Sequence, residues 1–304
     1  MTLQIAEGLA KSCRRNPARI EWLAQLPDIV AELTRRWSLS LGPPFLGDDV
    51  SCGWVTHATR ADGTPVVLKL GMPHFEGLDE LAGLRFWKGD VTVALLDADE
   101  VANAMLLEAC IPGTSLRGLA ESEQDVVLAT LLRRLWRDPP PDSDGDPRGQ
   151  SLATLTPGSS FRSLASMLAR WAAETRAQED AWPDPGLVRA GLALFEELTR
   201  TTERHVVLFT DLHAGNVLHA ERAPWLAIDP KPFVGDPAYD ATQHLINCPE
   251  RMRDAPHATI DRFADLLGVS GERVRRWMFA RAAAEPRDGW ATSPWLAVAR
   301  ALAP

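Results

Sequence analysis

Cysteine is scarce in this sequence of 304 residues. Its four cysteines, Cys13, Cys52, Cys110 and Cys248, lie far apart and none has CxxC spacing. This pattern argues against a disulfide framework and against a cysteine-based zinc site. Reduced thiols are typical of proteins inside the cell, so we expect a cytoplasmic location.

Long apolar runs are also missing. No run reaches the length of a transmembrane helix, and the first twenty residues lack the apolar core of a signal peptide. We therefore expect a soluble, intracellular protein that does not associate with membranes.

Basic charge is in deficit, with 32 Lys and Arg against 41 Asp and Glu and a net charge of -9. Proteins that bind nucleic acid usually present a basic face, so no nucleic-acid partner is expected. An acidic protein is compatible with a cationic ligand, although net charge alone does not identify one.

No internal repeat is visible, and the hydrophobic pattern changes character after the first 110 residues or so. Residues 18–37 have helical periodicity, with Pro27 as a kink or boundary, and "SLGPPF" then breaks the pattern. "CGWVTHATR" and "VVLKL" flank a turn at Asp62-Gly63 and predict a hairpin. A helix is expected over 78–87, followed by strands over 91–99 and 103–110. Residues 1–110 are therefore predicted to form a β-rich lobe with a helical extension over 1–40.

The remainder, residues 111–304, is predicted to form a larger and mostly helical lobe. Helices are expected over 122–136, 161–177 and 187–202, and from residue 238 onward. "RDPPPDSDGDPRGQS" is too rich in Pro, Asp and Gly for regular structure and predicts an exposed loop. The fold class is therefore α+β.

Polar residues with chemical potential gather in "LFTDLHAGNVLHAERAPWLAID". A strand over 206–209 precedes a loop from Asp211 to Asn216, and a hairpin then ends at Asp229. Protein kinases use a D-x-x-x-x-N loop, with a metal-binding Asp on the next hairpin strand. Mg²⁺ prefers hard oxygen ligands, so a carboxylate and an amide oxygen suit it, while a second carboxylate can accept the proton of a hydroxyl. Asp and Asn are also common in turns, so the spacing alone leaves both interpretations open.

Further motifs favour the catalytic interpretation. "TDLHAGNVL", "WLAIDPKPFVGDPAYDATQHL" and "DGTPVVLKL" resemble the aminoglycoside phosphotransferase family, in its streptomycin 6-phosphotransferase and hydroxyurea phosphotransferase branch. "WLAQLPDIVAELTRRWSL" and "LRFWKG" resemble the same branch, so the likeness runs from Trp22 to about Trp290. The resemblance implies a bilobal, protein-kinase-like fold.

The resemblance also implies roles for individual residues. Asp211 would be the catalytic base, and Asn216 and Asp229 would hold Mg²⁺. Lys69 in "VVLKL" would neutralise the α- and β-phosphates of the nucleotide. Its helix partner would be Glu80, with Glu76 as the alternative. His213 is expected to shape the loop rather than to transfer protons.

Nucleotide contacts are implied at two further places. The backbone of Glu108 to Cys110 would form the hinge that binds adenine. The loop "FLGDDVSCGWVTH" lacks a GxGxxG motif, so Ser51 and Gly53 are the candidates there. A departure from the family pattern also occurs before Asp211, where "LFT" changes the approach to the base.

The acceptor pocket should carry acids if the acceptor is a guanidinium-bearing antibiotic such as streptomycin. The candidates are Asp240, Glu285 and Asp288, with Trp290 as a stacking face; Asp240 could equally be a helix cap.

The activity implied is Mg²⁺-dependent transfer of phosphate from ATP, or from GTP, to a hydroxyl of a small cationic antibiotic. Streptomycin, phosphorylated at its 6-hydroxyl and so inactivated, is the first choice. Another aminoglycoside, hydroxyurea or a small hydroxylated metabolite is the alternative acceptor, and a nucleotide-binding pseudokinase is the alternative of another class. Monomer and dimer both stay open.

Overall fold

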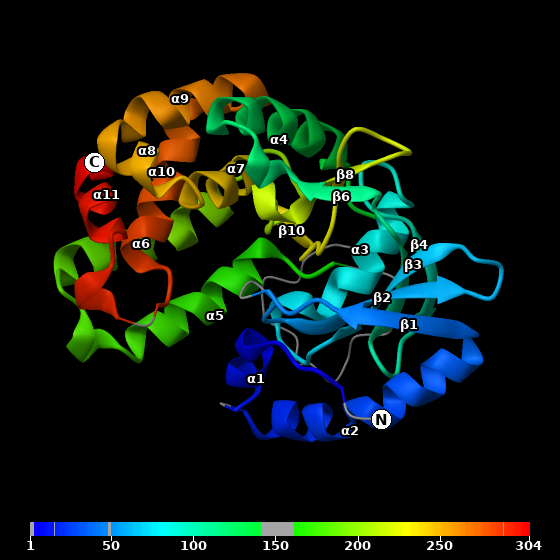
Figure 1. Cartoon of the computed structure of the whole chain (residues 1–304). Coiled ribbons are helices and arrows are strands. Elements are labelled where there is room, and N and C mark those ends of the chain that lie inside the picture. Colours follow the sequence, from blue (N-terminus) through cyan, green and yellow to red (C-terminus); the bar gives the residue numbers. More distant parts are fainter. Residues whose placement is uncertain (1–2, 15, 48–49, 141–160, 288) are drawn as a thin grey trace. The chain divides into compact units, whose positions relative to one another are not determined.

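The computed structural model describes residues 3–14, 16–47, 50–140, 161–287 and 289–304. The chain divides into two compact units (Figure 1). The first unit comprises Met1–Thr114 and Leu218–Pro230, and the second comprises Ser115–Val217 and Lys231–Pro304. No helix among the described residues is long and apolar enough to cross a membrane.

The first unit is built around a five-stranded antiparallel sheet. Its order is β1-β2-β3-β5-β4, with β1 at Leu39–Pro44, β2 at Gly53–Arg60, β3 at Pro65–Gly71, β4 at Leu95–Asp99 and β5 at Ala104–Glu108. The predicted hairpin is β2 and β3. The helical pattern ends before "SLGPPF", as expected, since α2 stops at Arg36; the sequence did not predict that most of this segment forms β1. Its prolines are tolerated because β1 is an edge strand whose register shifts between Leu41 and Pro44.

Helices cover both faces of this sheet. α1 at Glu7–Cys13 and α2 at Pro17–Arg36 form one apolar cluster with the sheet, and α3 at Glu80–Trp87 belongs to another. Successive residues of β5 alternate between the two clusters, as the pleat requires: Leu106 joins the first and Met105 and Leu107 join the second. Pro27 lies inside α2 and does not end it.

A three-stranded sheet of order β6-β8-β9 carries the motif hairpin. It contains β6 at Pro112–Ser115, β8 at Val217–Ala220 and β9 at Leu226–Ala227. Ala220 and Leu226 pack in the same apolar cluster as α3, which explains why this hairpin belongs to the first unit.

The second unit is mostly helical. Its strands β7 at Val206–Leu208 and β10 at Phe233–Gly235 pair antiparallel. Its helices are α4 at Glu121–Leu135, α5 at Leu164–Arg176, α6 at Pro185–Arg200, α7 at Pro237–Ile246, α8 at Pro249–Asp254, α9 at Pro256–Leu267, α10 at Gly271–Ala284 and α11 at Trp295–Leu302 (Figure 1). The expected helices are present, and most of the expected Pro-rich loop lies outside the described residues.

Candidate active site

Lys69 forms the centre of an ion-pair cluster in the first unit. Its Nζ lies 2.5 Å from Glu80 Oε1 and 2.8 Å from Asp229 Oδ1. Burial lowers the pKa of Lys69, but the carboxylates of Asp229 and Glu80 outweigh it and raise the pKa above its usual value. Of the two acids considered for this pair, Glu80 is therefore the one that binds Lys69.

Local backbone geometry fixes Asp229 in place. It follows β9 with a φ of 58°, a left-handed conformation that residues other than glycine seldom adopt. The strand before it is anchored, since Ala227 accepts from the Val93 amide at 3.0 Å and donates to the Val91 carbonyl at 2.8 Å. Strain of this kind is often kept at functional sites because the surrounding structure enforces it.

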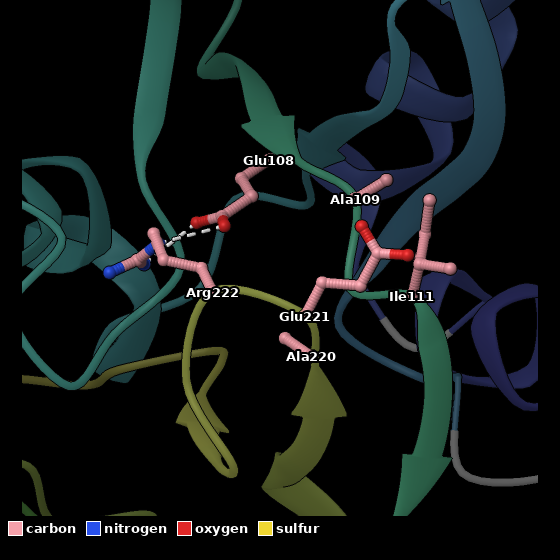
Figure 2. Close-up of a pocket in the computed structure, with 6 residues that line it drawn as sticks. All are labelled: Glu108, Ala109, Ile111, Ala220, Glu221 and Arg222. Carbon is pink, nitrogen blue, oxygen red and sulfur yellow. Dashed lines mark hydrogen bonds and ion pairs between the residues drawn. The ribbon is translucent and has the colours of Figure 1, made fainter.

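The predicted hinge is only partly open to a nucleotide. The Glu108 amide donates to the Ala94 carbonyl at 2.9 Å, so this one group of the Glu108 to Cys110 backbone is already engaged. Binding of adenine by this backbone stays a prediction. The Glu108 carboxylate pairs with Arg222 at 2.8 and 2.9 Å. A pocket of about 350 Å³ lies beside this pair (Figure 2). It is lined by Glu108, Ala109, Ile111, Ala220, Glu221 and Arg222.

Three other predicted nucleotide residues have local roles in the structure. A Cβ on Gly53 would lie 2.8 Å from the Leu70 carbonyl oxygen, so glycine there allows β2 to approach β3 closely. Ser51 Oγ lies 3.6 Å from Cys52 Sγ. Burial raises the pKa of the Cys110 thiol to about 11. Contacts of these residues with a nucleotide stay predictions.

In the second unit, the segment before Asp211 is held by a buried carboxylate. Asp240 accepts hydrogen bonds from the Phe209 amide at 2.9 Å, the Thr210 amide at 2.8 Å and Trp136 Nε1 at 2.9 Å. Thr210 has a φ of 54°, so the chain turns sharply before Asp211. Asp240 is 1% exposed. It therefore supports the catalytic loop from inside, which corrects its prediction as an acceptor contact.

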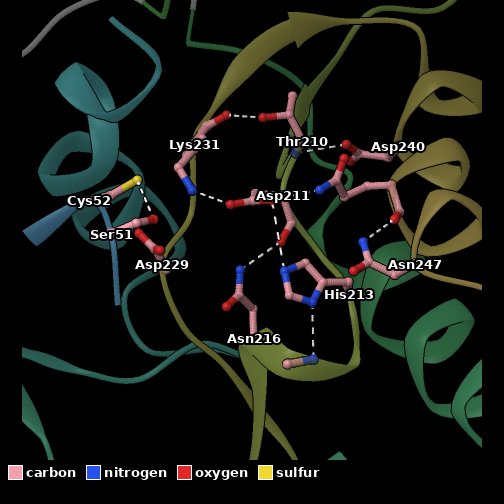
Figure 3. A network of polar contacts seen from close by, with 12 residues as sticks. Ser51, Cys52, Thr210, Asp211, His213, Asn216, Asp229, Lys231, Asp240 and Asn247 are labelled. Atoms are coloured by element: carbon pink, nitrogen blue, oxygen red, sulfur yellow. Dashed lines mark hydrogen bonds and ion pairs between the residues drawn. The ribbon is translucent and has the colours of Figure 1, made fainter. Parts of the chain in front are cut away.

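Two side chains bind the Asp211 carboxylate directly. Lys231 Nζ forms an ion pair with Oδ2 (Figure 3). Gln243 Nε2 donates to Oδ1 at 2.7 Å. Asn216 Nδ2 donates to the main-chain carbonyl of Asp211 at 2.9 Å, which fixes both ends of the D-x-x-x-x-N loop. The carboxylate is thus held in one orientation.

His213 caps the short helical turn η5 at Ala214–Asn216. Its Nδ1 accepts from the Gly215 amide at 3.1 Å, while its Nε2 lies 4.0 Å from Asp211 Oδ1. Gly215 is not left-handed; instead, a Cβ there would lie 2.5 Å from a guanidinium nitrogen of Arg117. A side chain at this position would therefore displace the Arg117 guanidinium.

Sequence reasoning missed Lys231, Gln243 and Arg281. Arg281 Nη2 donates to Gln243 Oε1 at 3.0 Å, which orients the Gln243 amide so that its Nε2 faces Asp211. Arg281 is 3% exposed and lies against the rings of Trp171 and Tyr239. The "PKP" triplet after Asp229 was a signal for Lys231, whereas the helical positions of Gln243 and Arg281 gave none.

Of the remaining acceptor candidates, the two that the structure describes, Glu285 and Trp290, are both engaged with other side chains. Glu285 binds Arg281 through both carboxylate oxygens, at 3.0 and 3.1 Å. Trp290 is 6% exposed, donates to Gln178 Oε1 at 2.5 Å and carries the Arg287 guanidinium over its ring. Its prediction as an open stacking face is therefore wrong, since the indole is covered. Asp288 lies outside the described residues.

The donor set fits Mg²⁺ better than a transition metal. Among the described residues, no group of three or more His, Cys, Asp and Glu side chains could hold a metal ion. Mg²⁺ is commonly held by one or two protein oxygens together with substrate phosphates. Asn216 donates through its Nδ2 within the loop, and the Asp229 carboxylate pairs with Lys69. That these two residues hold Mg²⁺ stays a prediction.

Comparisons with known proteins agree on one family. A family model described as aminoglycoside/hydroxyurea antibiotic resistance kinase matches residues 45–287. Streptomycin 6-kinase of Streptomyces griseus is 36% identical over 292 residues, covering 92% of this chain and 88% of that protein. Hydroxyurea phosphotransferase of Kitasatospora aureofaciens is 35% identical over 265 residues, covering 86% and 72%.

Solved structures show the same fold. Choline kinase LicA from Streptococcus pneumoniae matches with a TM-score of 0.61 at 13% identity, covering 92% of this chain and 99% of that chain. Aminoglycoside phosphotransferase APH(4)-Ia matches with a TM-score of 0.55 at 15% identity, covering 90% and 98%. The predicted α+β, protein-kinase-like fold is confirmed. The chain is a small-molecule kinase that belongs to the aminoglycoside/hydroxyurea antibiotic resistance kinase family.

Proposed function

We propose that this protein transfers the γ-phosphoryl group of ATP, with Mg²⁺, to the 6-hydroxyl of streptomycin and so inactivates the antibiotic. The Asp211 carboxylate, oriented by Lys231 and Gln243, is the observation that carries the proposal. The similarity to streptomycin 6-kinases over most of the chain supports the choice of acceptor.

Lys69 binds the phosphates of the nucleotide. Its buried ammonium, held by Glu80, neutralises the α- and β-phosphates of ATP. Asp229 and Asn216 provide the oxygen ligands for Mg²⁺, which when bound offsets the negative charge of the phosphates. The ion pair between Lys69 and Asp229 keeps these two groups next to each other.

Asp211 performs the proton transfer. The acceptor hydroxyl oxygen attacks the γ-phosphorus, and the bond from that phosphorus to the β–γ bridging oxygen breaks. The hydroxyl proton passes to the Asp211 carboxylate, and ADP leaves with the bridging oxygen. No phosphoenzyme forms, so catalysis depends on positioning and charge neutralisation.

A small neutral acceptor such as hydroxyurea is the second candidate. One relative is a hydroxyurea phosphotransferase, and the acids expected for a guanidinium-bearing acceptor are engaged elsewhere among the described residues. Asp240 is buried under the catalytic loop and Glu285 is paired with Arg281. A smaller acceptor needs fewer such acids.

An acceptor panel tests the proposal. ADP release is measured with streptomycin, hydroxyurea, other aminoglycosides and small amino alcohols, in the presence of Mg²⁺ and ATP. We expect turnover with streptomycin; turnover only with hydroxyurea would select the second candidate. Nucleotide binding without ADP release from any acceptor would indicate a pseudokinase instead.

The role of Asp211 has its own variant. Asp211→Ala should lower kcat by at least about a thousandfold, since the base and its orientation are both lost, while ATP binding stays within about threefold. Asp254→Ala, at a carboxylate that is 68% exposed and paired with its neighbour Arg253, is the matched control. Normal turnover by Asp211→Ala would show that another group accepts the proton.

A further inference from the structure

We propose that Lys231 is a second catalytic residue, whose ammonium binds the phosphoryl group while that group is transferred. The inference rests on the proposed phosphotransfer at Asp211 and adds to it a cation in the second unit. The structure shows this ammonium on Asp211 Oδ2 (Figure 3).

The main chain of Lys231 is fixed beside the catalytic loop. Its amide donates to the Phe209 carbonyl at 3.1 Å, and its carbonyl accepts from Thr210 Oγ1. Prolines at 230 and 232 flank it and restrict the backbone further. The ammonium therefore has a limited range of positions, all close to Asp211.

The positions that the Lys231 ammonium can reach include the site of the transferred phosphoryl group. A general base lies about 3 Å from the hydroxyl that it deprotonates, and the attacking oxygen starts about 3 to 3.5 Å from the phosphorus. An ammonium already in contact with Asp211 thus lies within one change of side-chain rotamer of the phosphoryl oxygens. The side chain of Lys231 is 13% exposed and that of Asp211 is 20% exposed, so solvent screens this interaction only in part.

Orientation of Asp211 does not require a cation. Gln243 already binds Oδ1 from a fixed position, because Arg281 holds the other end of its amide. The ammonium on Oδ2 is therefore not needed to orient the carboxylate, and it is available to act later in the reaction.

During the reaction, negative charge increases on the phosphoryl oxygens and decreases on Asp211, which favours binding of the Lys231 ammonium to the phosphoryl group. Negative charge spreads over the three equatorial oxygens of the phosphoryl group in the transition state. As Asp211 takes up the hydroxyl proton, its carboxylate loses charge and holds Lys231 less strongly. The ammonium then gains more from the phosphoryl oxygens than from Asp211, so it favours the transition state over the resting enzyme.

Arg281 does not fill this role. It hydrogen-bonds Gln243 rather than the Asp211 carboxylate, and its guanidinium is buried against Trp171 and Tyr239 and paired with Glu285. Among the contacts that the described residues make with the Asp211 carboxylate, Lys231 provides the direct positive charge.

Steady-state kinetics provide the first test, with Lys231→Met, Lys231→Arg and the full-length chain. We expect Lys231→Met to lower kcat by about a hundredfold, in the range found when one group that stabilises transition-state charge is removed. The KM values for ATP and acceptor should stay within about threefold, and Lys231→Arg should recover at least about tenfold in kcat. Lys11→Met, at an exposed lysine in α1, is the control. A kcat within about threefold of wild type in Lys231→Met would overturn the inference.

Binding of a transition-state analogue provides a second test that needs no acceptor. Calorimetry compares the affinity for ADP with Mg²⁺ in the absence and presence of aluminium fluoride, which takes the place of the transferred group. We expect aluminium fluoride to tighten ADP binding by wild type at least about tenfold more than by Lys231→Met. Equal tightening in both proteins, or tightening in neither, would refute the role of Lys231.

The Asp211→Asn background separates a catalytic role from a positioning role. If Lys231 acts only by holding Asp211, adding Lys231→Met to Asp211→Asn should not weaken analogue binding further, and that result would refute the inference. If Lys231 binds the phosphoryl group, the loss persists in the double variant. Wild type that turns over no acceptor would count against the proposed function, while the analogue measurement still decides the role of Lys231.

Discussion

Replacing Asp240 with Asn distinguishes a support of the catalytic loop from an acceptor contact. Burial raises the pKa of Asp240 to about 6, so at about pH 8 the group is a carboxylate that only accepts hydrogen bonds. Oδ2 accepts from Trp136 Nε1 and the Phe209 amide, and Oδ1 accepts from the Thr210 amide. An Asn side chain has one oxygen, so it can replace either Oδ1 or Oδ2 as an acceptor but not both.

The cost follows from that count. If the Asn oxygen takes the place of Oδ2, the Asn side chain keeps the hydrogen bonds from Trp136 Nε1 and the Phe209 amide. Its NH₂ group then faces the Thr210 N–H, which is left without an acceptor. Losing one bond to a charged acceptor and leaving a buried donor unpaired costs about 2 to 4 kcal/mol. At about 2 to 4 °C per kcal/mol, the midpoint of thermal unfolding should fall by roughly 4 to 16 °C.

Thermal unfolding followed by circular dichroism at about pH 8 measures this shift, with the exposed Asp254→Asn as control. The turn at Thr210 should loosen, so kcat should fall together with stability. An Asp240→Asn protein that unfolds like wild type but has a raised KM for acceptor would refute the reasoning and restore Asp240 as a substrate contact.

Two further predictions concern other buried ion pairs. Glu80→Gln should lower kcat about 10- to 100-fold in the ADP-release assay, because Lys69 then loses its ion pair with Glu80 and retains the one with Asp229. The control Glu76→Gln should change kcat by no more than about twofold. Equal losses of kcat in the two variants would contradict the assignment of Glu80 as the partner of Lys69. Burial raises the pKa of Asp125, but hydrogen bonds from His244 and Arg251 outweigh it and lower the pKa well below its usual range. Asp125 therefore contributes stability above its unfolded pKa of 3.8, and this contribution is lost as the pH falls below that value. Asp125→Asn should cost about 3 to 5 kcal/mol in urea unfolding at neutral pH and flatten the acid slope; an unchanged slope would contradict this.

The sequence determined the elements and the motif residues. Helical periodicity predicted α2 and α4, the Asp62-Gly63 turn predicted the β2–β3 hairpin, and D-x-x-x-x-N spacing predicted the loop from Asp211 to Asn216. These signals are local, since period, turn chemistry and motif spacing depend on neighbours along the chain. The family likeness added the lysine of "VVLKL" and its partner acid.

Contacts between distant segments were beyond the sequence. The sequence did not predict the edge strand β1, because prolines usually argue against a strand. They are tolerated here since β1 pairs with a neighbouring strand on one side only. The sequence left Asp240 as an acceptor contact or a helix cap, and only the structure shows its three hydrogen-bond donors, two of them from the segment before Asp211.

The surroundings of Asp211 show most clearly what the sequence predicted and what only the tertiary structure decided. "TDLHAGNVL" identified Asp211 as the candidate base. Only the tertiary structure brought Lys231, Gln243 and Arg281 to it, from positions 20, 32 and 70 residues further along the chain. Side chains so far apart in sequence meet through the pairing of β7 with β10 and the packing of α7 against α10, and no local pattern records that meeting.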